Sequence, residues 1–132
     1  MATTTAAITI TSTDLTTDSL SLSTTATLTK AGTANGLDQL VGVSRKTVAT
    51  AGVTTIFAAS DYTADRAHKL YVKNTSTTDA HNVIVTFASQ AVGRLYAGDW
   101  MFFPWSAATN ADISYTASVT TGMVIEHMII SE

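Results

Sequence analysis

Apolar and polar residues alternate along most of this chain, and alternation with a period of two is the pattern of β-strands. From residue 39 onward, short alternating runs separated by turn residues recur every 8–15 residues, which predicts eight to ten strands in all. No window of 11 or more residues carries the apolar stripe of an amphipathic helix. Because short strands at this spacing are typical of all-β folds, we expect an antiparallel β-sandwich of the jelly-roll-like or Ig-like type.

The N-terminal third carries a thinner version of the same pattern. Its large apolar residues alternate with threonine or serine in two runs: Ile8, Ile10, Leu20 and Leu22. Residues 1–36 contain three charged side chains, far fewer than a solvated domain of that length usually carries. We therefore interpret residues 1–36 as an extended Thr-rich N-terminal arm or as edge strands of the same sandwich, and residues 37–132 as the β-sandwich domain.

Two apolar runs in the middle of the chain flank a polar stretch. The alternate apolar positions in them are Leu70, Val72, Val83, Val85 and Phe87. We expect these side chains to share one face of a paired hairpin whose tip is the seven-residue polar loop 75–81.

The segment WMFFPW, residues 100–105, is apolar on both sides of a strand. Pro104 has no N–H to donate, which favours an edge position. Tryptophan is enriched in interface hot spots, so this segment is interpreted either as an intermolecular contact or as ordinary core. Together with the apolar residues of the arm it gives the candidate interface residues: Ile8, Ile10, Leu20, Leu22, Trp100, Phe102, Phe103 and Trp105.

MVIEHMII, residues 123–130, is also apolar on both faces. Ile125 and Ile129 share one face with His127, and the alternate residues share the other. Such a strand lies centrally, or has its second face covered by a loop, the arm or another subunit.

The amino-acid composition argues against several classes of function. The 132 residues fit one domain, and the absence of cysteine excludes disulfides and thiolate metal sites. Charged residues make up 13%, about half the usual share of about 25%, and 26 threonines replace them. The net charge of −3 argues against nucleic acid, and the apolar runs are too short to span a membrane. A neutral β surface is poorly protected against pairing with other chains, which favours a homo-oligomer or another assembly.

No pattern of catalytic or metal-binding residues is present in the sequence. His68, His81 and His127 lack metal-ligand spacing, and neither a nucleophile elbow nor a P-loop occurs. The acidic residues lie mostly at turns, where aspartate bonds its own backbone. We expect no enzyme activity, no cofactor and no metal. The aromatic residues Tyr62, Tyr71, Tyr96, Trp100, Trp105 and Tyr115 leave sugar binding open as an alternative, because small β-sandwiches often stack sugars on aromatic side chains.

Residues 67–132 resemble small β-sandwich virion proteins of tailed bacteriophages. The landmarks are KLYVKN (69–74), LYAGD (95–99), FPW (103–105), ISYTAS (113–118) and MVIEHMII (123–130). The Thr-rich opening is also similar to structural proteins of phages that infect cyanobacteria. The resemblance implies a structural protein of the virion, a head decoration or cement protein that binds between major capsid proteins.

Its expected location is the capsid surface, after assembly in the host cytoplasm, and a homotrimer is the expected oligomer. The alternative within the resemblance is a tail, neck or fibre component with a receptor- or glycan-binding module.

Overall fold

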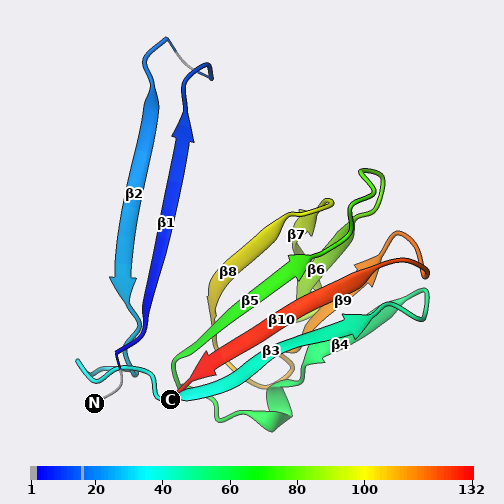
Figure 1. Cartoon of the computed structure of the whole chain (residues 1–132). Helices are drawn as coiled ribbons and strands as arrows, with labels where there is room; N and C mark the ends of the chain where they lie inside the picture. The colour runs from blue at the N-terminus through cyan, green and yellow to red at the C-terminus, as the bar shows by residue number, and fades with distance from the viewer. Residues whose placement is uncertain (1–2, 16) are drawn as a thin grey trace.

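The computed structural model describes residues 3–15 and 17–132. Within these residues ten strands and one short 3-10 turn follow one another along the chain (Figure 1). The elements are β1 (Thr5–Ser12), β2 (Leu20–Thr27), β3 (Gln39–Thr47), β4 (Val53–Phe57), η1 (Ala59–Asp61), β5 (His68–Asn74), β6 (Val83–Phe87), β7 (Gln90–Leu95), β8 (Trp100–Trp105), β9 (Ile113–Ala117) and β10 (Val124–Ser131).

Eight of the described strands form a sandwich of two antiparallel sheets. The front sheet has the order β3-β10-β5-β8, and the back sheet has the order β4-β9-β6-β7 (Figure 1). Fully buried side chains from both sheets fill the space between them, among them Leu70 and Ile129 from the front and Val85 and Ile113 from the back. The all-β sandwich predicted from the alternation is confirmed.

The prediction of a paired hairpin over residues 70–87 is wrong. β5 lies in the front sheet and β6 in the back sheet, so the two strands face each other across the core instead of sharing hydrogen bonds. Buried Asn74 holds the chain where it crosses between the layers, because its side-chain amide donates to the carbonyls of His81 and Leu95, each at 3.2 Å. The apolar residues of both strands do point into one core, as their alternation indicated.

The two segments that are apolar on both faces lie as their alternation predicts. β8 is an edge strand paired only with β5 among the described strands, in accord with Pro104. β10 lies between β3 and β5, with Ile125 and Ile129 buried in the core. Ile130, on the opposite side of β10, is buried against Leu28 and Leu37, so residues of the N-terminal third cover one end of that second face.

β1 and β2 pair with each other over their full length and form a sheet of their own. The resulting hairpin projects from the sandwich beside β8 (Figure 1). Among the described strands no other strand pairs with β1 or β2, so the hairpin is not an edge of either sandwich sheet.

Candidate interaction surface

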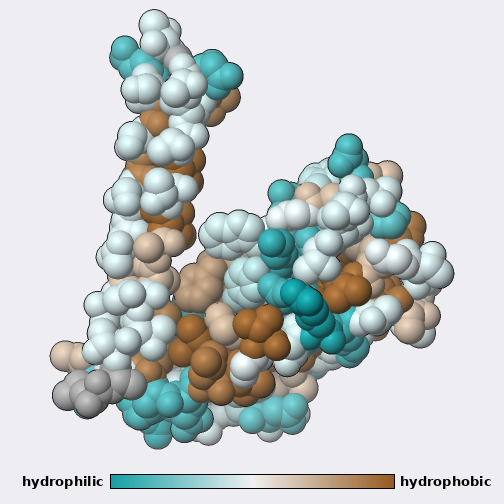
Figure 2. Space-filling model, viewed as in Figure 1, coloured by the Kyte–Doolittle hydropathy of each residue, from teal (hydrophilic) through white to brown (hydrophobic). Residues whose placement is uncertain are grey.

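One side of the β1–β2 hairpin is apolar and exposed. The register pairs Ile10 with Leu22, and the period of two places the other apolar residues on the same side. We call this the apolar face of the hairpin; its residues are Ala6, Ile8, Ile10, Leu20, Leu22 and Ala26. The opposite side carries threonine, serine and one alanine. Ile10 and Leu22 are each 49% exposed. Apolar side chains line the edge of the hairpin that is turned toward the sandwich (Figure 2).

An isolated two-stranded hairpin is only marginally stable in water. Three or more strands with an apolar face, or packing against another element, are needed for independent stability. Ala6 packs against the cluster of Leu28, Leu37 and Ile130, whereas Ile10, Leu20 and Leu22 stay exposed. Most of the apolar face of the hairpin thus has the composition of a buried surface without the burial of one.

The base of the hairpin is fixed to the sandwich by a small second core. Leu28 and Leu37 are buried against Ile130, and Phe102 and Met128 pack around them. The N–H of Leu28 donates to the carbonyl of Thr4 at 2.8 Å, and the N–H of Leu37 donates to the carbonyl of Leu28 at 2.9 Å. The hairpin therefore begins at a packed, hydrogen-bonded root instead of a loose linker.

The Glu132 carboxylate ties this root to the sandwich. It accepts hydrogen bonds from the N–H of Ala31 at 3.0 Å and the N–H of Ala67 at 3.2 Å, and it lies 3.6 Å from the Arg66 guanidinium. Burial alone would raise the pKa of Glu132, but the two N–H groups and Arg66 outweigh burial and hold the pKa below its ordinary value. The root is thus stabilised by an ionised carboxylate.

The outer face of the front sheet, which points away from the core, is partly apolar. Phe102 and Met128 continue outward from the root, and Trp100 lies beside Tyr71 with ring centroids 6.5 Å apart. Apolar side chains gather on the sandwich close to the root (Figure 2). The outer face therefore offers apolar contact area next to the hairpin.

Charged groups also lie on this outer face. Glu126 accepts from Arg45 at 2.9 Å and from the Tyr71 hydroxyl at 3.3 Å. The hydrogen bond from Arg45 is the main cause that lowers the pKa of Glu126. Lys69 and Lys73 point to the same side, since the alternate residues of β5 are buried. We call the strand positions on the outer face of the front sheet its outward ladder positions. They carry three cationic side chains and one anionic side chain.

The candidate interface residues from the sequence fall into two groups. The four from the N-terminal third lie together on the apolar face of the hairpin, and Trp100 and Phe102 lie on the outer face of the front sheet. Phe103 and Trp105 point into the core, which corrects their assignment to a contact surface. Trp105 is only 5% exposed, and its ring N–H donates to the carbonyl of Ala111 at 2.8 Å.

Edge strand β3 is an exposed apolar surface that the sequence analysis did not single out. Leu40, Val41 and Val43 are all exposed there. The available signal was the pair Arg45 and Lys46, because basic side chains are a common protection of edge strands against pairing.

The buried His68 and the partly buried His127 lie at the periphery of an aromatic cluster in the core. His68 contacts Trp105 and Tyr62, and His127 lies edge-on to Phe57 at 5.4 Å. Burial lowers the pKa of His127, so its ring is neutral in the folded protein at neutral pH. Within the described part of the chain, no three His, Cys, Asp or Glu side chains gather as a metal site would require.

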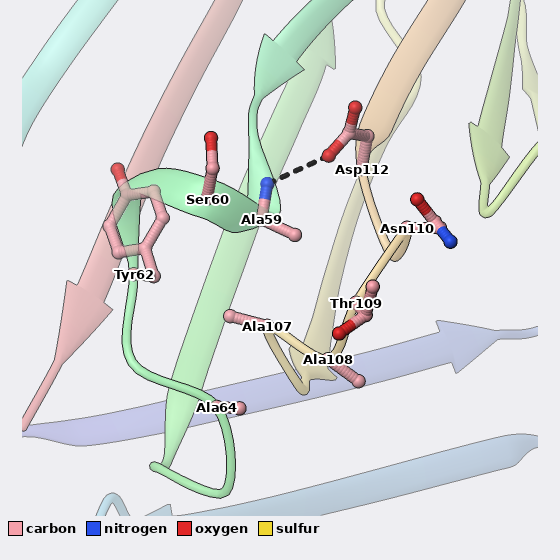
Figure 3. Close-up of a pocket in the computed structure, with 9 residues that line it drawn as sticks. All are labelled: Ala59, Ser60, Tyr62, Ala64, Ala107, Ala108, Thr109, Asn110 and Asp112. Atoms are coloured by element: carbon pink, nitrogen blue, oxygen red, sulfur yellow. Dashed lines mark hydrogen bonds between the residues drawn. The ribbon is translucent and has the colours of Figure 1, made fainter.

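A cleft of about 450 Å³ lies at one end of the sandwich, beside η1 (Figure 3). Of the nine residues drawn there, Tyr62 and Asp112 are ionisable. Asp112 is occupied in holding η1, since its carboxylate accepts from the N–H of Ala59 at 2.8 Å. Burial and the neighbouring Asp61 raise the pKa of Tyr62, so its hydroxyl stays protonated. The lining is otherwise small and uncharged and holds no pair of groups suited to acid–base or nucleophilic chemistry.

The chain matches no protein-family model, and neither curated proteins nor solved structures gave a match. The described residues include no helix long and apolar enough to cross a membrane.

Proposed function

We propose that this protein is a structural protein of a virion, a capsid decoration or cement protein that stabilises the head by binding between major capsid proteins. The observation that carries the proposal is the exposed apolar face on a hairpin whose root is fixed. A surface of this kind is stabilised when other protein covers it.

The physical requirements of a cement protein agree with this composition. Such a protein must add binding area without performing chemistry, and it must keep that area when the ionic environment changes. Contacts between uncharged side chains are little affected by salt, because screening acts mainly on exposed charges. The packed root also lowers the entropy lost when the hairpin docks, since its attachment is already ordered.

The resemblance of residues 67–132 to tailed-phage virion proteins supports the same proposal. Its landmarks are structural: KLYVKN ends β5 at the buried Asn74, and FPW ends β8 at the buried Trp105. Residues of this kind maintain a sandwich and leave its outer surface and the hairpin to provide binding.

A binding experiment with tailed-phage heads that lack the protein tests the proposal. Purified protein is added in excess, and bound copies are counted after the heads are separated by sedimentation. We expect saturation at a fixed number of copies per capsid subunit. The Ile10→Asp/Leu22→Asp variant should lose binding, because it places two carboxylates on the apolar face of the hairpin.

The matched control is Thr9→Asp/Ser23→Asp. These residues form the neighbouring cross-strand pair and point to the opposite side of the same hairpin. The control adds the same charge at nearly the same position along the hairpin, and it should bind heads as the wild type does. Wild-type protein that does not bind heads, or equal binding by both variants, would contradict the proposal.

A second candidate is a fibre or tail module that binds glycans. The exposed Trp100, next to the partly buried Tyr71, favours it, because sugars stack on aromatic faces. A glycan array with the wild type and Trp100→Ala tests this candidate. Reproducible sugar binding that disappears in the variant would favour it over the capsid role.

A further inference from the structure

We infer that the apolar face of the hairpin binds the outer face of the front sheet of a second copy of this chain. This inference rests on the proposed function, because it names the partner that completes a contact surface of the decoration protein. Each chain then donates one hairpin and receives another, and the copies close into a ring.

Away from the root, one chain leaves both surfaces uncovered. Ile10 and Leu22 remain half exposed although the outer face of the front sheet lies beside the hairpin. The root holds the hairpin at an angle to the sandwich through the buried Leu28 and the Glu132 carboxylate. An apolar face held away from its own sheet is open to the sheet of another copy.

The two surfaces also carry complementary charges. The only ionisable side chains in residues 5–27 are Asp14 and Asp18, so the hairpin carries a charge of −2. The outward ladder positions of the front sheet carry Lys69, Lys73 and Arg45 against Glu126, a charge of +2. Opposite charges of equal size favour contact between these two surfaces.

The same charges argue against two hairpins packing face to face. With the two hairpins in parallel orientation, that arrangement would bring together four aspartates at the tips of two surfaces that have no basic side chain. It would also leave the apolar outer face of the front sheet, with the exposed Trp100, uncovered.

The area of the hairpin face limits the strength of the contact. An eight-residue ribbon of two strands is about 27 Å long and about 10 Å wide, so one face covers about 270 Å². In a closed ring each chain makes two separate contacts of this size, with about 270 Å² per partner in each. A stable interface uses about 800 Å² per partner, so the ring should form with modest affinity and depend on protein concentration. An open pair with one contact would bury only half as much.

Photo-crosslinking tests the contact directly. Leu22 is replaced by p-benzoylphenylalanine, and unlabelled chains are mixed with ¹⁵N-labelled chains so that links between copies are distinguished by mass. We expect mixed-label links from residue 22 to peptides of β5, β8 and β10. Links only within one chain, links only to the hairpin of another copy, or no links at about 100 µM protein would overturn the inference.

The solution mass provides the second readout. Ile10→Asp/Leu22→Asp should weaken self-association by at least about 100-fold, whereas Thr9→Asp/Ser23→Asp should leave it unchanged. Lys69→Glu should weaken it by about two- to fivefold, and Arg94→Glu, on β7 of the back sheet, should not. A mass of 13.8 kDa for the wild type at about 100 µM would also overturn the inference.

These results separate the inference from the proposed function. A wild-type monomer that still binds heads would remove the contact between copies and keep the decoration role. A self-associated protein that does not bind heads would remove the decoration role and keep the contact.

Discussion

The β1–β2 hairpin and the sandwich are built from the same kinds of residue, but they use their apolar side chains differently. In the sandwich, residues such as Leu70 and Ile129 have no exposed surface, because two sheets cover one another. In the hairpin, Ile10 and Leu22 lie on a single sheet with no second layer, and they stay half exposed. The difference shows that alternation is enough to form a strand, whereas burial requires a second surface.

Substitution of the two tryptophans on β8 should give the largest difference in stability between a buried and an exposed position. Trp105 is 5% exposed and Trp100 is 51% exposed. Trp105→Ala should lower the free energy of unfolding by about 3–5 kcal/mol, because it removes a core ring and leaves a cavity. Trp100→Ala should lower it by no more than about 1.5 kcal/mol, through its contact with Tyr71. Urea unfolding measures both, and equal losses would show that the two positions do not differ as described.

A matched aliphatic pair compares the two regions themselves. Ile129→Ala should cost about 2–5 kcal/mol of unfolding free energy, since the side chain is fully buried. Leu22→Ala should change the same quantity by about 0.5 kcal/mol or less, as exposed positions usually do. Both variants are compared by urea unfolding at concentrations low enough to keep the chain monomeric. A large loss in Leu22→Ala under these conditions would mean that the hairpin already packs against its own chain.

The root that joins the two regions should depend on one carboxylate. Glu132→Gln weakens the bonds to Ala31 and Ala67, so amide hydrogen exchange should become faster over residues 28–38. Glu126→Gln is the control, because it removes the same charge from β10 outside the root. Unchanged exchange in Glu132→Gln would show that apolar packing alone fixes the root.

Acidification of the wild type should speed amide exchange at the root as Glu132→Gln does. The pKa of Glu132 is lowered from 4.5 in the folded chain, so the stability contributed by its ionised form is present above pH 4.5. This contribution is lost as the pH falls through the lower folded pKa. Faster exchange over residues 28–38 should therefore appear in the wild type on acidification below pH 4.5, and its absence would contradict this role of the carboxylate.

The smallest expected effect is a dependence of sandwich stability on pH through His127. Burial lowers its pKa from 6.5, so the unfolded chain binds this proton more readily than the folded chain does. The free energy of unfolding should be highest above pH 6.5 and should decrease as the pH falls toward the folded pKa. His127→Gln should flatten this slope between about pH 7 and pH 5.5. A slope unchanged in His127→Gln would contradict the assignment.

Much of the fold could be predicted from alternation, because the period of two determines which residues of a strand share a side. Alternation correctly grouped the residues of β8 and of β10 that share a side, and Pro104 correctly indicated that β8 is an edge strand. Alternation does not determine which strands pair, and the segment between β5 and β6 is long enough to cross between layers. The predicted hairpin therefore failed although its apolar residues do meet in the core.

The candidate surface was predicted less completely for a related reason. A strand that is apolar on both faces does not reveal which face is the core, so Phe103 and Trp105 were grouped with Trp100 and Phe102. Trp105 lies in the core, and its burial leaves no unpaired ring N–H because that group donates to the carbonyl of Ala111. The role of Glu132 had no local signal, since its partners Ala31 and Ala67 lie 101 and 65 residues away in sequence.

The central claim is that other protein covers the apolar face of the hairpin when the molecule assembles. Hydroxyl-radical labelling read by mass spectrometry tests it side chain by side chain, with dilute monomer compared against the assembled state. We predict that labelling of Ile10 and Leu22 decreases strongly on assembly, whereas Val53 and Val92, exposed on the back sheet, keep theirs. Equal labelling of Ile10 and Leu22 in both states would contradict the claim.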